Sequence, residues 1–185
     1  MLCVFVAEMS EVCMMGKLGD TALGFACVSL IINIIAIALP YWFYSEKKFP
    51  WGLSIEYYGL WITCNQSEIH DQLEPAVCDT FETAEGHLNM TAIRALEITG
   101  LLLVAISVIT GFLKFVRRNP AILCLAGGLA ILAGFFIVLG AVVFGSKTKG
   151  VFEKGATLHV GFAFAVLSGA LAVLAGCMFV SGRSE

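Results

Sequence analysis

The chain has 185 residues, of which 59% are hydrophobic and 14% charged, and its mean hydropathy is +0.90. A soluble domain carries about 25% charged residues, so this composition argues against one. The apolar residues gather in runs long enough to cross a bilayer, which predicts a polytopic membrane protein. A net charge of −3 without a basic stripe argues against a nucleic-acid partner.

Four apolar segments predict four transmembrane helices. We expect these spans at residues 21–42, 92–116, 121–144 and 160–180, separated by a loop at 43–91, a turn at 117–120 and a second loop at 145–159. Residues 1–20 and 181–185 are expected to be tails, and translation could start at Met1, Met14 or Met15. Each span can cross a hydrocarbon core of about 30 Å. Because short connections force neighbours to be antiparallel, the predicted fold is a mainly α, antiparallel four-helix bundle.

Three polar side chains fall in or near these spans. Asn33, near the middle of the first span, predicts an interhelical hydrogen bond in preference to a transport role. Arg94 and Glu97 lie one turn apart at the start of the second span. Arg94 is expected to pair with Glu97 or with a loop carboxylate, because an unpaired charge at that depth is unfavourable. Small residues that allow close helix packing recur at every fourth position in the last two spans: Ala126, Ala130, Gly134, Ser168, Ala172 and Gly176.

The first loop is the largest polar segment and carries eight acids against two lysines. Its only cysteines, Cys64 and Cys78, predict a disulfide, since His70 alone does not supply the further ligands of a zinc site. Asn65 and Asn89 begin glycosylation acceptor patterns, although Asn89 is close to the second span. Residues 54–64 have strand composition, so we expect a small antiparallel sheet stapled by the disulfide.

The positive charges divide almost equally between the two sides of the membrane. The compact basic cluster in the second connection favours that side as cytoplasmic: Lys114, Arg117 and Arg118. The cysteines and the glycosylation patterns lie in the opposite loop, which is therefore expected outside, with both termini inside. The three tryptophans lie in this loop or at its root and are expected at the membrane surface: Trp42, Trp51 and Trp61.

Several motifs together resemble the claudin superfamily, which includes claudins, peripheral myelin and epithelial membrane proteins and calcium-channel gamma subunits. The resemblance lies in Trp42, in Gly59-Leu60-Trp61 followed by Cys64, in Cys78, and in Arg94 at the start of the second span. The segment 153–161 is similar to the claudin entry to the fourth helix, and the resemblance covers most of residues 15–181. It is closest to divergent invertebrate claudin-like proteins.

The resemblance implies a junction protein of the plasma membrane that adheres to neighbouring cells and forms a paracellular barrier or a cation-preferring pore. Its partners would be lipid and itself or other claudin-like chains in cis and trans. The chain departs from the family in its short second loop and in lacking paired cysteines after the second and fourth spans. The end at Glu185 offers no hydrophobic residue to a PDZ scaffold. The alternative is an auxiliary subunit that regulates a channel or receptor in the same membrane.

Family members place first-loop charges along the path between cells, so acids there are candidates for the pore. Glu56 is favoured because it precedes Gly59-Leu60-Trp61 on the expected strand, and Glu68 and Asp71 are further candidates. The loop carboxylates beyond Cys78 are equally consistent with a solvated face. The three histidines are scattered without nucleophile–base spacing, so we expect no enzyme, no metal and no cofactor: His70, His87 and His159.

Overall fold

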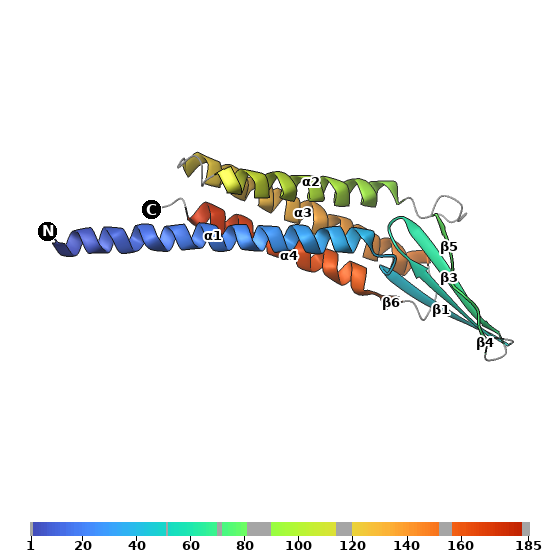
Figure 1. Cartoon of the computed structure of the whole chain (residues 1–185). Helices are drawn as coiled ribbons and strands as arrows, with labels where there is room; N and C mark the ends of the chain where they lie inside the picture. Colours follow the sequence, from blue (N-terminus) through green and yellow to red (C-terminus); the bar gives the residue numbers. More distant parts are fainter. Residues whose placement is uncertain are drawn as a thin grey trace.

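The computed structural model describes residues 2–50, 52–69, 72–80, 90–113, 120–151 and 157–182. Four helices lie alongside one another and a β-sheet projects from one end of the bundle (Figure 1). The helices are α1 (Leu2–Ala38), α2 (Thr91–Leu113), α3 (Pro120–Val151) and α4 (Val160–Ser181). Each contains an apolar stretch of 21 to 27 residues, long enough to cross a membrane. The chain is a multi-pass membrane protein, and the expected mainly α fold with an antiparallel sheet is confirmed.

The helix bounds differ from the expected spans at several places. The helix α1 begins at Leu2, inside the segment expected to be a tail. The helix α1 ends at Ala38, four residues before Trp42, because Pro40 lacks an N–H group and disfavours helical geometry at Leu39. The helix α3 continues to Val151, which is beyond the expected end at residue 144. The beginning of α1 and the end of α4 lie at the end of the bundle that is opposite the sheet (Figure 1).

Small residues bring the helices close together. In α3 and α4 the expected stripes are buried, and a Cβ added to Gly134 would lie only 2.5 Å from the carbonyl oxygen of Gly169. Hydroxyl groups add hydrogen bonds between helices. The Ser29 hydroxyl of α1 donates to the Ser168 carbonyl of α4 at 2.9 Å, and the Ser107 hydroxyl of α2 donates to the Ala126 carbonyl of α3 at 2.7 Å. In lipid such close packing, rather than hydrophobic burial, holds helices together.

The sheet has six antiparallel strands in the order β4-β3-β2-β1-β6, with β5 also paired to β3. Its strands are β1 (Phe43–Phe49), β2 (Gly52–Tyr58), β3 (Ile62–Ile69), β4 (Gln72–Leu73), β5 (Val77–Thr80) and β6 (Thr157–Leu158). The segment 54–64, which has strand composition, contributes to two strands, because Gly59-Leu60-Trp61 turns the chain between β2 and β3. The strand β6 comes from the segment before α4, so it ties that segment to β1.

Candidate functional site

Trp42 anchors the sheet in the bundle. Its side chain is fully buried, and its indole Nε1–H donates to the carbonyl of Ala36 at 2.6 Å. One edge packs on the Phe144 ring of α3, with the ring centroids 5.1 Å apart. Another edge occupies the space that a side chain at Gly161 would need, since a Cβ there would lie 2.6 Å from the indole Cδ1. Trp42 therefore locks the end of α1 against α3 and α4.

The turn Gly59-Leu60-Trp61 forms the second contact between the sheet and the bundle. A Cβ added to Gly59 would lie 2.7 Å from the Cα of Pro40, so only glycine allows this close approach. Leu60 is 1% exposed and packs in one apolar cluster with Trp42, Ile93 and other residues of the bundle. Trp61 is 41% exposed. The turn thus buries one side chain and leaves its neighbour at the surface.

Arg94 of α2 holds this turn from the other side. Its Nε–H donates to the Leu60 carbonyl at 2.7 Å, and its guanidinium lies 5.1 Å from the centroid of the Trp61 ring. The expected pairing with Glu97 is wrong, because neither carboxyl oxygen of Glu97 has a hydrogen-bond partner among the described residues, and the alternative pairing with a loop carboxylate stays a prediction. The sequence placed the two residues on one helix face but gave no sign that a loop carbonyl would take the guanidinium. We call Trp42, Gly59, Leu60, Trp61 and Arg94 the junction.

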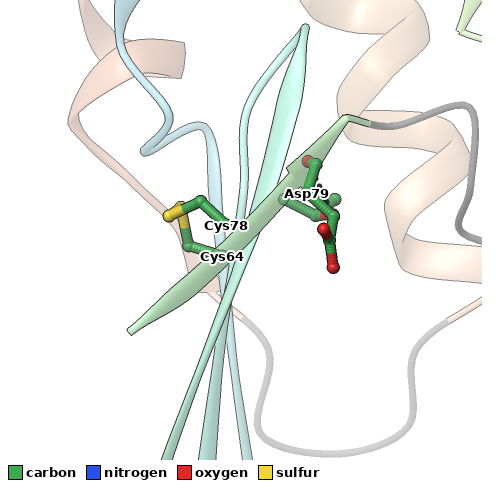
Figure 2. Close-up of a disulfide and its surroundings, with 4 residues drawn as sticks. Cys64, Cys78 and Asp79 are labelled. Atoms are coloured by element: carbon green, nitrogen blue, oxygen red, sulfur yellow. Dashed lines mark hydrogen bonds between the residues drawn. A yellow bond between two sulfur atoms is a disulfide. The ribbon is translucent and has the colours of Figure 1, made fainter. Parts of the chain in front are cut away.

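Cys64 of β3 and Cys78 of β5 form the expected disulfide. The two residues are paired across the strands, and their Cα atoms are 4.0 Å apart. Closing a loop with a sequence separation of 14 restricts the unfolded chain by about 3 kcal/mol. Figure 2 shows the sulfur atoms on one side of these strands and the Asp79 carboxylate on the other side. The disulfide therefore fixes which way Asp79 faces.

The strand register separates the loop charges onto two faces. Glu56 pairs with Asn65, Asn65 pairs with Val77, and Thr63 pairs with Asp79, so these side chains share one face. We call this side of β1, β2, β3 and β5 the Glu56 face. The disulfide lies on the opposite side, together with Glu68, whose partner is Leu53. The structure therefore does not bring Glu68 together with Glu56.

Glu56 is an engaged carboxylate. Lys47 of β1 donates to both of its oxygens at 3.0 Å, and the Tyr58 hydroxyl donates to Oε2 at 2.8 Å. Burial, together with the neighbouring Glu56 carboxylate, raises the pKa of Tyr58, so its hydroxyl remains a neutral donor. The positive charge of Lys47 offsets the negative charge of Glu56, which sequence reasoning did not foresee.

Asp79 is the uncompensated acid of the Glu56 face. It is exposed and makes no ion pair with any residue that the structure describes. It lines an open groove of about 170 Å³ together with Glu56, Tyr58, Thr63, Cys64, Asn65 and Val77. The sequence showed Asp79 only as one of eight acids. Its place directly after Cys78 in a strand was the signal that could have singled it out.

The glycosylation patterns and the remaining charge candidate have different outcomes. Asn65 is exposed on the Glu56 face, where its side-chain oxygen accepts a hydrogen bond from the Ser54 hydroxyl at 3.1 Å. Asp71 and Asn89 lie outside the described residues. Within the described part of the chain, no group of three or more His, Cys, Asp and Glu side chains could hold a metal ion.

The whole arrangement agrees with one comparison. The model of the PMP-22/EMP/MP20/Claudin family matches residues 17–180, which include three membrane-spanning stretches in full, all but the last residue of the fourth, the junction and the disulfide. A comparison with individually curated proteins finds no match. Because the family model covers most of the chain, including the residues that join sheet to bundle, the protein belongs to the PMP-22/EMP/MP20/Claudin family.

Proposed function

We propose that this protein is a claudin-like cell-junction protein that contributes to adhesion and to a paracellular barrier with a cation-preferring path. In this arrangement the sheet is outside the cell and both termini are cytoplasmic. Family membership and a disulfide within the sheet support this orientation, since disulfides persist in oxidising compartments. Copies of the chain, or other claudin-like chains, would associate within one membrane and across two membranes.

The charge balance of the Glu56 face is the observation that carries the cation preference. Lys47 and Glu56 offset each other at 3.0 Å, which leaves the exposed carboxylate of Asp79 as the excess charge beside the groove. A path lined by one sign of fixed charge concentrates counter-ions and repels co-ions. Asp79 therefore replaces Glu56 as the first candidate for setting selectivity, and Glu68 lies on the wrong face to share that path.

Glycosylation of Asn65 would control access to the path along the Glu56 face. Its side chain lines the groove next to Asp79 and Glu56. A glycan at Asn65 would lie over the groove and obstruct the path, whereas an unmodified Asn65 would leave the path open. Treatment of surface-delivered protein with a glycosidase, followed by mass mapping of the peptide, distinguishes the two forms.

The test is a dilution potential across an epithelial monolayer that lacks its own claudins. We expect junctional localisation and a preference for sodium over chloride that added salt weakens by screening. Asp79→Asn should reduce that preference by about twofold, since one unit charge at about 8 Å in water changes the local cation concentration by about that factor. Glu68→Gln, on the opposite face, is the matched control and should change it little.

Two results would contradict the proposal. An anion preference of the wild-type chain, or a cation preference unchanged in Asp79→Asn with junctional localisation intact, would remove Asp79 and the Glu56 face from the path. Diffuse surface localisation with co-purification of a channel would instead favour the alternative function, an auxiliary subunit that regulates a channel or receptor in the same membrane.

A further inference from the structure

A carboxyl group and a carboxamide are buried together inside the membrane-spanning part of the bundle. Glu97 lies six residues after the start of α2, about 9 Å along the helix. Its side chain is fully buried, as is that of Asn33 on α1. The Asn33 carboxamide lies close enough to the Glu97 carboxyl to interact with it. Neither group serves the junction or the Glu56 face.

All four polar atoms of this pair lack a formed hydrogen bond. The two oxygens of Glu97 and the oxygen and nitrogen of Asn33 have no hydrogen-bond partner among the described residues. Buried polar groups are rarely left in this state, and a native exception calls for an explanation. A buried ionisable group within a membrane span is also a default indicator of function.

The helix α3 packs against this site, which is formed by α1 and α2. A Cβ added to Gly140 would lie 2.8 Å from Oε1 of Glu97, so glycine makes room for the carboxyl group. The charged side chains described on the helices packed against Glu97 all lie elsewhere. Arg94 is one turn away and engaged by Leu60 and Trp61, Lys147 is about two turns from Gly140 along α3, and Asp20 is 13 residues before Asn33 on α1. No described cation is therefore placed to neutralise a carboxylate at Glu97.

The chemistry of the two groups favours one protonation state. A carboxylic acid has one O–H donor and one carbonyl acceptor, while a carboxamide has N–H donors and one carbonyl acceptor. The two can satisfy each other with a pair of hydrogen bonds after a small side-chain rotation. A carboxylate could accept from the Asn33 N–H group, but it has no donor for the Asn33 oxygen. Its negative charge would have no cation beside it, in surroundings where such a charge is strongly disfavoured.

We propose that Glu97 and Asn33 form an intramembrane proton-binding site, in which Glu97 is held as a carboxylic acid and hydrogen-bonded to Asn33. The bound proton joins α1 to α2 directly beneath the junction. Loss of the proton would leave a bare carboxylate between α1, α2 and α3 and loosen their packing. Because Arg94 is one turn away on α2, this loosening would also shift the contact between Arg94 and the Leu60 carbonyl, which holds the sheet on the bundle.

Infrared spectroscopy of the full chain in lipid nanodiscs tests the protonation state directly. We expect a carboxylic-acid carbonyl band at neutral pH that is lost in Glu97→Gln and retained in Glu74→Gln, an exposed carboxylate of the sheet. In Asn33→Leu the band should remain but move to higher frequency, because the acid carbonyl loses its hydrogen bond. A spectrum without an acid band, or a band that survives in Glu97→Gln, would overturn the proposal.

Thermal unfolding at several pH values tests the coupling to stability. Wild-type protein should lose melting temperature as the pH rises through the point where Glu97 ionises, because the unfolded chain then binds fewer protons than the folded one. Glu97→Gln keeps the shape and the hydrogen bonds but has no proton to release, so this loss should disappear. Glu74→Gln should keep it.

Two further results would contradict a protonated Glu97. Sodium-dependent stabilisation at constant ionic strength that vanishes in Glu97→Gln would show an ionised carboxylate that binds a cation. The same loss of melting temperature in wild type and Glu97→Gln would place the titrating group elsewhere. If Glu97→Gln does not fold, the position of the acid band in wild type and in Asn33→Leu decides the matter alone.

Discussion

The junction and the Glu56 face lie in the same small sheet, yet their side chains have opposite surroundings. At the junction, Trp42 is fully buried and Leu60 is 1% exposed. Glycine is required at Gly59, which meets the Pro40 backbone, and at Gly161, which meets the Trp42 ring. On the Glu56 face, the Lys47 side chain is 47% exposed and Asp79 is open to solvent. Shape dominates the first region, and charge dominates the second.

The residues that make the chain most recognisable therefore have a structural role. Trp42, Gly59, Leu60 and Arg94 seat the sheet on the bundle, so they can be shared by proteins with unrelated activities. The residues that would distinguish one such activity from another lie on the exposed face. Substitutions should separate the two roles. Those at the junction should change the stability of the fold, and those on the Glu56 face should change the ion preference.

The largest effect is expected at Trp42. Trp42→Ala would leave a cavity between the end of α1, Phe144 and Gly161 and would destabilise the fold by about 3–5 kcal/mol. Surface delivery should fall sharply, and the melting temperature in detergent should drop. Trp61→Ala is the matched control, because this ring is 41% exposed and its contact with Arg94 is worth about 0.5–1 kcal/mol. Equal effects of the two substitutions would refute the anchoring role of Trp42.

A smaller effect is expected at Arg94. Arg94→Ala leaves the Leu60 carbonyl without its donor and removes the cation from the Trp61 ring, at a cost of about 1–3 kcal/mol. Arg94→Lys should be milder, since an ammonium group can reach either partner but lacks the planar fork that serves both. Surface biotinylation and thermal unfolding measure the effect. Wild-type behaviour of Arg94→Ala would show that the turn holds without it.

The smallest effect on stability, and a purely electrostatic effect on function, is expected at Lys47. Lys47→Met removes the cation that offsets Glu56, so the cation preference in a dilution potential should rise by about twofold. The double substitution Lys47→Met with Glu56→Gln restores the original charge balance and should restore the original preference. A rise that persists in the double variant would mean that pair neutralisation is not the cause.

Much of the architecture was predictable from local signals. Four long apolar segments predict four helices, because only a helix satisfies its own backbone inside lipid. Two cysteines alone in one polar loop predicted the disulfide. Strand composition at Ser54 to Cys64 predicted the sheet, but the reason that the turn needs Gly59 is its close approach to Pro40, which is distant in the sequence.

The candidate site was less predictable. Glu56, Glu68 and Asp79 are all loop acids in the sequence, and only the pairing of β2, β3 and β5 places Asp79 with Glu56 and Glu68 on the other side. Arg94 and Glu97 are one turn apart, which favours a pair on an isolated helix. In the folded protein Arg94 instead donates to the Leu60 carbonyl and packs on the Trp61 ring, and the neighbouring helix α1 places Asn33 beside Glu97.

The number of helices, the disulfide and the acidic loop follow from local sequence, because hydrophobic length, cysteine isolation and net charge are properties of contiguous segments. Folding in three dimensions sets which acids share a face, which cation neutralises Glu56, and which buried groups meet inside the bundle. Those outcomes depend on strand register and helix rotation, in which a shift by one residue turns a side chain to the opposite side. Register and rotation are fixed by contacts such as Trp42 with Gly161, between residues far apart in the chain.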